Sequence, residues 1–320
     1  MKRIVIIGAG RSASVLINYL AQHTATDKYE VIVADRDSAL AKSKCEGLAN
    51  VKAVQLNASD TEERRQLISG ANVVISMLPA FLHLPIIEDC IDLKVNVITP
   101  SYISPEVEAL NHKAVQNNVF VMNELGLDPG IDHMSAMAVM DKLKEEGNII
   151  TGFESFCGGL VAPESDDNPW NYKFTWNPRN VVLAGQGGVV KFLHNDKYKY
   201  IPYHKLFRRT ERIDMGEFGM YEGYANRDSL KYKDIYNLNN AHTVFRGTLR
   251  RPGFSRAWDL FVQLGVTDDT FVIENTQGMT YREFFNSFLA YHKEDSVELK
   301  MKNYSKNWCG WVASLKRKLK

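Results

Sequence analysis

Short apolar runs alternate with amphipathic segments through the first 124 residues of the chain. The runs have the length of buried strands, and apolar residues recur at helical spacing in the segments between them. Strands alternating with helices predict an α/β fold with a doubly wound parallel sheet of the Rossmann type. The expected strands are 4–7, 31–34, 51–56, 73–78, 95–99 and 119–122, and the expected helices are 12–22, 38–45, 61–68, 84–91 and 105–116.

The pattern changes after residue 124. Segments 153–157, 189–193 and 243–249 are rich in β-forming residues, and Tyr, Trp and Asn are plentiful. A chain of 320 residues is long enough for two domains with separate cores. We therefore expect a Rossmann domain over 1–124 and a second, α+β domain over 125–320.

A glycine-rich turn follows the first predicted strand. Gly8 permits a tight strand-to-helix turn, Gly10 lets the backbone approach a pyrophosphate, and small Ala13 allows close helix packing. The helix that begins near Arg11 offers its free N–H groups to phosphates. Glycine-rich turns also occur without a ligand, but the position of this one after an N-terminal strand favours a dinucleotide site.

Asp35, at the end of the second predicted strand, bears on the choice of cofactor. A carboxylate there accepts adenosine ribose hydroxyls and repels a 2′-phosphate, which favours NAD and leaves NADP as the alternative. Asp35 or Asp37 has a second interpretation as the cap of the next helix. Arg36 has the chemistry to stack on adenine or to bind a 2′-phosphate.

Ligands of doubly wound sheets lie beyond the carboxyl ends of the strands. This rule makes the residues that follow each strand the candidates for cofactor binding. They are Gly8, Gly10, Arg11, Ser12, Ala13, Asp35, Arg36, Asn57, Ala58 and Ser76, with further candidates at 100–102 and 123–128.

Composition narrows the class of protein. A net charge of +1 argues against a nucleic-acid partner, and no apolar run is long enough to cross a bilayer. The four cysteines show no CxxC pairing and no signal peptide is recognised, which predicts a cytoplasmic protein. The eight histidines are scattered, so no metal site is expected.

Several separated motifs resemble the saccharopine dehydrogenase (glutamate-forming) family, also called saccharopine reductases. The resemblance covers about residues 1–265, and its motifs occur in the family's order. They are Ser-Tyr-Ile-Ser-Pro at 101–105, Asn-Glu-Leu-Gly-Leu-Asp-Pro-Gly-Ile-Asp-His at 123–133, Cys-Gly-Gly-Leu at 157–160, Ala-Pro-Glu at 162–164, Asn-Pro at 168–169, Tyr-Lys-Phe-Thr-Trp at 172–176, Asn-Arg-Asp-Ser at 226–229 and Arg-Gly-Thr-Leu-Arg at 246–250.

The resemblance implies an NAD(P)-dependent enzyme of lysine metabolism. Saccharopine, water and the oxidised cofactor would give glutamate and 2-aminoadipate 6-semialdehyde, through hydride removal beside the secondary amine and hydrolysis of the resulting imine. Such chemistry needs a neutral amine, an activated water and firmly held carboxylates. A guanidinium suits the carboxylates because its fork binds them bidentately.

The resemblance also assigns roles to individual residues. It places Asp128, Tyr102 and Cys157 at the reacting groups. It assigns substrate contacts to Ser101, Tyr102, Asp128, Arg227, Thr248, Leu249 and Arg250, and cofactor contacts to Thr99, Pro100, Leu127, Asp128, Pro129 and Trp176.

Each chemical candidate has a structural alternative. Asp128 before a proline has the form of a helix N-cap. Cys157 suits a buried small apolar residue, Tyr102 a packed ring with a bonded hydroxyl, and Arg227 a surface ion pair with Asp228. His133 is interpreted as a surface or packing residue.

The chain departs from the family at three places. Pro100 replaces the usual serine or alanine and removes a backbone N–H, and Arg251 stands where relatives commonly have an aromatic residue. The chain also looks shortened or diverged beyond residue 265. Its last segment, with Trp308, Trp311 and a basic end, is interpreted as a packed helix rather than a membrane or partner contact.

Two other functions remain open. One is a catalytically silent relative that binds the cofactor as a sensor or scaffold. The other is a carboxynorspermidine- or homospermidine-type dehydrogenase, against which the two arginines, Arg227 and Arg250, argue. The expected partner is a small-molecule amino-dicarboxylate such as saccharopine, without nucleic acid or membrane, and a homodimer through the second domain's sheet is a further expectation.

Overall fold

The computed structural model describes residues 1–183 and 188–304. The chain divides into two compact units, Met1–Ala138 and Val139–Lys320, and the division falls inside one helix. The predicted boundary at residue 124 stays a prediction.

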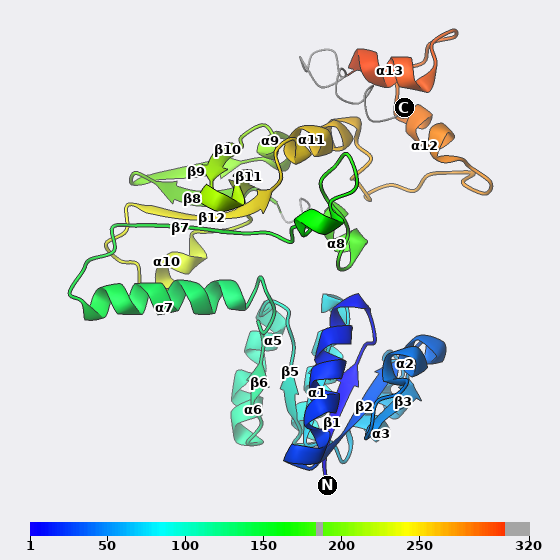
Figure 1. Ribbon diagram of the computed structural model, residues 1–320, viewed down its shortest axis with the longest axis vertical. Coiled ribbons are helices and arrows are strands. Elements are labelled where there is room, and N and C mark those ends of the chain that lie inside the picture. Colours follow the sequence, from blue (N-terminus) through cyan, green and yellow to red (C-terminus); the bar gives the residue numbers. More distant parts are fainter. Residues whose placement is uncertain (184–187, 305–320) are drawn as a thin grey trace. The chain divides into compact units, whose positions relative to one another are not determined.

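The first unit contains a six-stranded parallel sheet, as the sequence predicts, and its strand order is β3-β2-β1-β4-β5-β6 (Figure 1). The order reverses direction beside β1, which is the topological switch point of a doubly wound fold. The strands are β1 Lys2–Ile7, β2 Tyr29–Asp35, β3 Val51–Gln55, β4 Val73–Ser76, β5 Asn96–Ile98 and β6 Val121–Met122.

Helices of the first unit connect successive strands. Two of them, α2 Ser38–Cys45 and α3 Thr61–Ile68, have the predicted bounds. The helix expected over 105–116 is instead two short helices that meet at Leu110. The other elements are η1 Arg11–Ala13, α1 Ser14–Asp27, η2 Ala80–Leu82, α4 His83–Asp92, α5 Pro105–Ala109, α6 Asn111–Gln116 and α7 Ile131–Glu145.

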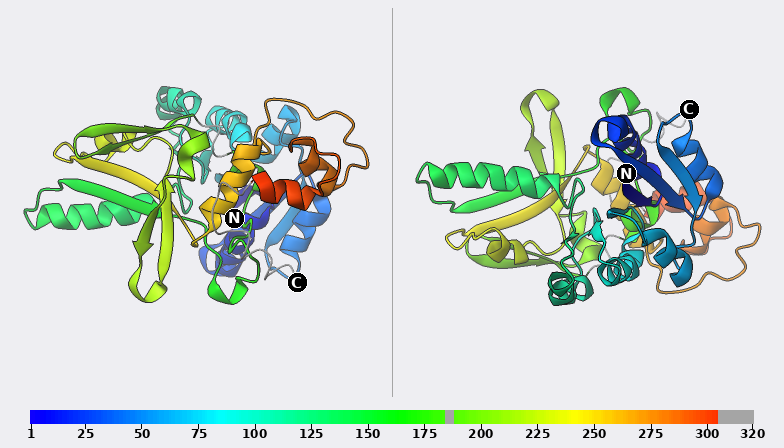
Figure 2. Two further views of the ribbon diagram at one scale, coloured as in Figure 1. Left: turned by 90° about the horizontal axis from the view of Figure 1, so that it is seen from above. Right: turned by 90° about the horizontal axis from the view of Figure 1, so that it is seen from below.

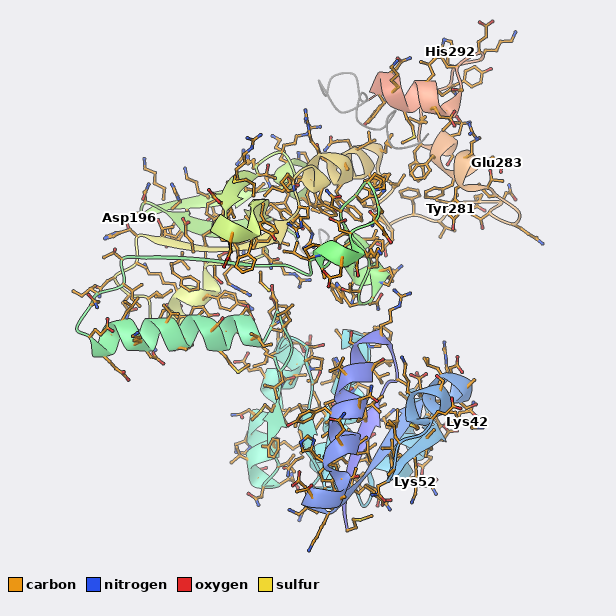
Figure 3. All side chains as sticks on the ribbon, in the orientation of Figure 1. Lys42, Lys52, Asp196, Tyr281, Glu283 and His292 are labelled. Carbon is orange, nitrogen blue, oxygen red and sulfur yellow. The ribbon has the colours of Figure 1, made fainter. Side chains whose placement is uncertain are left out.

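Both faces of the parallel sheet are buried. Alternate residues of β1 belong to different clusters: Val5 and Ile7 pack with α4, whereas Ile6 packs with Ile17 of α1. Because a strand covered on both faces needs apolar side chains at successive positions, the sequence shows the central strands β1 and β2 as continuous apolar runs. Strand β3 lies at the edge, where Lys52 pairs with Glu30 of β2 at 3.0 Å (Figure 3).

The second unit is built on another sheet, with the order β10-β11-β12-β8-β9 and with β7 parallel to β12. All other pairings in this sheet are antiparallel. The α+β class expected from the sequence is therefore confirmed for this unit. Its strands are β7 Gly152–Cys157, β8 Val190–His194, β9 Lys197–Ile201, β10 Glu211–Asp214, β11 Met220–Ala225 and β12 Thr243–Arg250.

Aromatic side chains dominate the core of the second unit, where Tyr172, Tyr224, Phe254 and Trp258 pack together. A loop over 265–280 separates α11 from α12, and Figure 2 shows it as an extended orange segment. The remaining elements are η3 Pro163–Ser165, α8 Pro178–Val182, α9 Tyr203–Leu206, η5 Gly216–Phe218, α10 Lys231–Ile235, α11 Phe254–Leu264, α12 Tyr281–Ser287 and α13 Val297–Tyr304.

Candidate functional site

The glycine-rich turn lies directly after β1, at the carboxyl end of the sheet. Gly8 has φ +108°, and a Cβ there would lie 3.0 Å from the backbone of Met77, so the turn requires glycine. Gly10 has open space where a Cβ would point, and Ala13 is buried against the sheet. This geometry fits a dinucleotide pyrophosphate, which needs close backbone approach at the second glycine.

The carboxylate of Asp35 is bonded to the backbone of this turn. It accepts hydrogen bonds from the N–H of Ala9 at 2.7 Å and from that of Asp37 at 2.9 Å. Asp37, not Asp35, caps α2 by accepting from Ala39 and Leu40. A carboxylate has about four lone-pair sites, so Asp35 retains capacity for ribose hydroxyls. Arg36 beside it is exposed.

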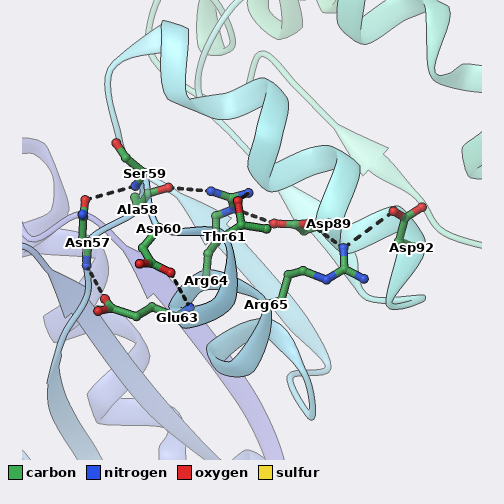
Figure 4. Close-up of polar contacts among 10 residues, drawn as sticks. All are labelled: Asn57, Ala58, Ser59, Asp60, Thr61, Glu63, Arg64, Arg65, Asp89 and Asp92. Atoms are coloured by element: carbon green, nitrogen blue, oxygen red, sulfur yellow. Dashed lines mark hydrogen bonds and ion pairs between the residues drawn. The ribbon is translucent and has the colours of Figure 1, made fainter.

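The loop after β3 carries Asn57 and Ala58, and an ion-pair network holds it (Figure 4). Arg64 of α3 donates from Nη1 to the Ala58 carbonyl at 2.8 Å and from Nε to Asp89 of α4 at 2.5 Å. Arg65 donates to the other oxygen of Asp89 at 2.6 Å. Asp89 and Arg64 are both buried. Through the bond from Arg64 to the Ala58 carbonyl, this buried ion pair holds the loop in place.

Ser76, Thr99 and Ser101 surround a histidine that the sequence interpretation did not include. His83, the first residue of α4, has its Nδ1 2.9 Å from Ser76 Oγ and its Nε2 2.8 Å from Ser101 Oγ. Thr99 Oγ1 lies 3.1 Å from Nε2. The rule that ligands lie beyond the carboxyl ends of the strands points to Ser76 and to the residues after β5. It does not point to His83, because this residue starts the helix α4 and belongs to no recognised motif.

Burial lowers the pKa of His83 to about 4, because the imidazolium would lose its hydration. The unfolded chain, with an ordinary histidine pKa near 6.5, binds more protons than the folded chain between pH 6.5 and 4. The stabilisation of the folded state that comes from keeping His83 neutral is therefore fully present above pH 6.5, and it is lost as the pH falls toward 4.

We expect this acid-dependent loss to reach at most about 3 kcal/mol near pH 4, from about 1.4 kcal/mol per pKa unit. Urea unfolding of the wild type and of His83→Gln between pH 7 and 4.5 measures it. The variant should show a shallower loss of stability with acid. Parallel curves for the two proteins would contradict the assignment.

Two of the candidate catalytic residues, Tyr102 and Asp128, are joined by a short hydrogen bond. The Tyr102 hydroxyl donates to Asp128 Oδ1 at 2.5 Å, and both side chains are half-buried. The helix-cap interpretation of Asp128 is wrong, because α7 begins only at Ile131. The Asp128–Pro129 peptide bond is cis. Asp132 instead accepts the N–H of Gly130 at 2.8 Å.

Four further residues lie in or next to the Tyr102 and Asp128 segments of the first unit. Pro100 packs beside Gly126, where a Cβ would lie 3.3 Å from the Pro100 side chain. Leu127 is exposed and Pro129 is buried. His133 has its Nε2 3.3 Å from a carboxylate oxygen of Glu124, which agrees with its interpretation as a packing residue.

In the second unit, Cys157 ends β7 opposite Thr248 of β12. The thiol is half-buried. Gly158 follows, and a Cβ there would lie 2.3 Å from the Leu249 carbonyl oxygen and 3.0 Å from Arg250 Nη1. Only glycine lets the two segments approach this closely.

Arg250, the last residue of β12, is held among aromatic rings. Its guanidinium lies 5.0 Å from the ring centroid of Tyr172, 5.2 Å from that of Phe254 and 5.9 Å from that of Tyr224. Nη1 donates to the Leu249 carbonyl at 2.9 Å, whereas Nε is buried without a hydrogen-bond partner among residues 1–183 and 188–304. Arg251 is half-buried over the Tyr221 ring at 4.7 Å.

Of the other candidates of the second unit, Leu249 is buried and Thr248 is half-buried, whereas Arg227 and Trp176 are exposed. Arg227 has φ +45°, and its carbonyl accepts the N–H of Lys191 at 2.9 Å. Asp228, the suggested ion-pair partner of Arg227, lies 3.4 Å from the Lys191 ammonium. Trp176 exposes 44% of its surface.

The fold and the glycine-rich turn define a protein of the nicotinamide-dinucleotide-binding class with an appended α+β domain. Two family models match the chain: the saccharopine dehydrogenase NADP binding domain over residues 4–122 and the saccharopine dehydrogenase C-terminal domain over residues 126–306. The chain belongs to the saccharopine dehydrogenase family, as its motifs predict.

Named relatives agree with this assignment. The chain is 37% identical over 269 residues to the mitochondrial alpha-aminoadipic semialdehyde synthase of Bos taurus, covering 83% of this chain and 28% of the relative. It is 36% identical over 273 residues to the saccharopine dehydrogenase [NADP(+), L-glutamate-forming] of Saccharomyces cerevisiae, covering 84% of this chain and 59% of the relative. The chain thus spans little more than half the length of the yeast enzyme.

A solved structure of apo saccharopine dehydrogenase (L-Glu forming) from Saccharomyces cerevisiae superposes with a TM-score of 0.80 at 32% identity. It covers 95% of this chain and 67% of that one. The predicted preference for NAD finds no support, because the matching domain model and the yeast relative are both named for NADP.

Within residues 1–183 and 188–304, no helix has the length and apolarity of a membrane span. The same part of the chain holds no group of three or more His, Cys, Asp or Glu side chains placed for a metal ion. The predictions for Trp308, Trp311 and the basic end concern residues outside those that the structure describes.

Proposed function

We propose that the chain is an oxidoreductase of lysine metabolism that acts on the CH–NH group of saccharopine or a similar amino-dicarboxylate. One hydride leaves the carbon beside the secondary amine for the nicotinamide, and the imine left behind adds water. The C–N bond then breaks, giving glutamate and 2-aminoadipate 6-semialdehyde with release of one proton. The proposal extends the family assignment to a reaction and a substrate.

The environment of Arg250 is the observation that supports this function best. Its guanidinium is partly desolvated by three aromatic rings, and its buried Nε has no acceptor among the described residues. A buried donor without an acceptor is costly, and a carboxylate oxygen would relieve that cost. The polyamine substrates of the alternative dehydrogenases carry more amines and fewer carboxylates to meet it.

The Tyr102–Asp128 pair supplies the proton chemistry of the proposal. A bound nicotinamide dinucleotide supplies the hydride acceptor. Asp128 would take a proton from the substrate amine or from the attacking water at a carboxylate oxygen, and the Tyr102 hydroxyl, which donates to Asp128 Oδ1 at 2.5 Å, holds that carboxylate in place. We propose that the substrate contacts Ser101 in the first unit and Cys157, Thr248, Leu249 and Arg227 in the second. Trp176 is proposed to contact the cofactor.

The test of the function is reduction of NAD or NADP by the purified chain on addition of L-saccharopine at mildly alkaline pH. Formation of glutamate together with the reduced cofactor supports the proposal. A folded chain that binds the cofactor and reduces none of it contradicts the proposal and favours the silent relative. Carboxynorspermidine and homospermidine serve as competing substrates.

Arg250→Lys should raise the KM for saccharopine about 10- to 100-fold, because lysine keeps the charge but loses the planar fork. The dissociation constant of the cofactor should stay within about twofold, which fluorescence titration measures. Arg209→Lys, an exposed exchange of the same kind, is the matched control. Equal KM values for Arg250→Lys and Arg209→Lys would argue against carboxylate binding by Arg250.

We further propose that the cofactor is NADP and that Arg36 binds its 2′-phosphate. Arg36 is exposed directly after β2, where the adenosine ribose lies in doubly wound folds. The NADP-binding domain model that matches the chain and the yeast relative named for NADP(+) support this choice. Cytoplasmic location and a homodimer stay predictions.

Arg36→Ala should raise the KM for NADP about 10- to 100-fold, because one charge-assisted contact to the phosphate is lost. The KM for NAD, which lacks that phosphate, should stay within about threefold. Steady-state kinetics with both cofactors measures the ratio. An equal effect on NAD and NADP would indicate adenine stacking, and a wild type that prefers NAD would restore the original interpretation of Asp35.

A further inference from the structure

One buried imidazole joins the ends of two neighbouring strands. His83 is 4% exposed and lies between Ser76, the last residue of β4, and two residues that follow β5, Thr99 and Ser101. Its two ring nitrogens have different shortest contacts, Nδ1 with the Ser76 hydroxyl at 2.9 Å and Nε2 with the Ser101 hydroxyl at 2.8 Å. The Thr99 hydroxyl lies further away, 3.4 Å from Nδ1 and 3.1 Å from Nε2. The direction of the two shorter hydrogen bonds decides what Ser101 offers to a ligand.

The burial of Ser76 fixes the first direction. Its side chain is 0% exposed, and within residues 1–183 and 188–304 its hydroxyl has His83 Nδ1 as its hydrogen-bond partner. A buried O–H that donates to nothing costs free energy, so the Ser76 hydroxyl donates and Nδ1 accepts. Nδ1 therefore carries no proton.

The second direction follows from the charge of the ring. Burial holds the pKa of His83 at about 4, so the imidazole is neutral near pH 7 and carries one proton. With Nδ1 as an acceptor, that proton is on Nε2. Nε2 donates to Ser101 Oγ at 2.8 Å, and Thr99 Oγ1 at 3.1 Å is a second acceptor within reach.

We infer that His83 positions Ser101 as a hydrogen-bond donor, because the Nε2–H group occupies a lone pair of Ser101 Oγ and directs the hydroxyl proton away from the ring. Ser101 is half-buried, so its proton is available to a ligand. A donor at this place selects an acceptor, such as a carboxylate oxygen, over an ammonium group. The identity of that acceptor as a saccharopine carboxylate rests on the proposed function.

The tautomer can be tested without any activity. Long-range ¹H–¹⁵N spectra of the full chain labelled at histidine distinguish protonation at Nδ1 from protonation at Nε2, and the signals absent from His83→Gln belong to His83. We expect a neutral ring with its proton on Nε2 from pH 7 down to pH 5.5. A proton on Nδ1, or a charged ring, overturns the inference.

Two substitutions separate the roles of the two ring nitrogens. Glutamine places its amide near the Nε2 position and keeps a donor to Ser101, whereas the shorter asparagine places its amide near Nδ1 and keeps only the Ser76 contact. His83→Gln should leave the KM for saccharopine within about threefold, and His83→Asn and Ser101→Ala should each raise it about tenfold, the effect of one hydrogen bond.

The kinetic signature separates positioning from general structural damage. In His83→Asn, kcat and the cofactor dissociation constant should stay within about twofold of the wild type, and adding Ser101→Ala should raise KM no further, because both changes remove one interaction. Equal KM values for the Gln and Asn variants, or additive effects in the double variant, overturn the inference.

The two proposals can fail separately. A wild-type chain that binds cofactor but does not oxidise saccharopine would overturn the proposed function alone, and the tautomer measurement would still decide the role of His83. An Nε2-protonated ring in such a chain would support the positioning of Ser101.

Discussion

Asp128→Asn should lower kcat for saccharopine oxidation about 10²- to 10⁴-fold, the usual contribution of a positioned acid or base. The change keeps the shape of the side chain, and its amide oxygen still accepts the hydroxyl of Tyr102, which donates to Asp128 Oδ1 at 2.5 Å. The variant loses the capacity of the carboxylate to take a proton. The loss should appear in kcat and kcat/KM equally, because proton transfer belongs to the transition state.

The control for Asp128 is Asp141→Asn, the same chemical change on an exposed residue of α7. It should leave kcat within about twofold, as surface substitutions usually do. Steady-state kinetics over the alkaline range measures both variants. Tyr102→Phe, which removes only the phenol, should lose less than Asp128→Asn. A full rate in Asp128→Asn would contradict its role as the proton acceptor.

Asp89→Ala should destabilise the first unit by about 3–5 kcal/mol, because it leaves the Arg64 guanidinium buried without its counter-charge. The two side chains are about 5% exposed and joined at 2.5 Å. Arg64 also holds the Ala58 carbonyl, so the loop that follows β3 should loosen with it (Figure 4). Amide hydrogen exchange in β1, β3 and β4 under urea measures the loss within this unit.

Asp92→Ala, one turn away on α4, is the matched control. Its carboxylate lies 2.6 Å from Lys113 and 3.7 Å from Arg65 but is 40% exposed, so its loss should cost less than about 1 kcal/mol. Replacing both members of the buried pair, as in Arg64→Met with Asp89→Ala, should restore much of the stability. A double variant no better than Asp89→Ala would show that the network acts through packing alone.

Apolar patterning predicted the parallel sheet but not all of the second sheet. Strands covered on both faces need apolar residues throughout, which is why the central strands β1 and β2 were visible as runs, whereas β3 at the edge is mostly exposed. Three strands of the second sheet were missed. Strands β9 and β10 are mostly exposed, with the sequences Lys-Tyr-Lys-Tyr-Ile and Glu-Arg-Ile-Asp, whereas β11 is largely buried but has Glu222 and Gly223 in its middle. Strand β9 pairs with β8 and β10 pairs with β11, in each case the neighbouring strand along the chain, and the side chains of β9 and β10 give no continuous apolar signal.

Helix bounds were predictable where a side chain caps the helix. Asp37 and Asp60 accept backbone N–H groups at the starts of α2 and α3, and both helices have the predicted bounds. The same rule misled at Asp128, whose carboxylate binds a phenol 26 residues away instead. His83 was missed for a related reason, because its hydroxyl partners come from separate strands and only the fold brings them together.

The approach of Gly158 to β12 has a consequence for how freely this chain can vary. A side chain at position 158 would collide with the carbonyl oxygen of Leu249, which accepts a hydrogen bond from the Arg250 guanidinium. Conservative exchanges are available at many positions with assigned chemistry, such as serine for Cys157. At position 158 even alanine would displace the carbonyl that accepts the hydrogen bond from the guanidinium, so substitution should be poorly tolerated at a residue that has no reactive group of its own.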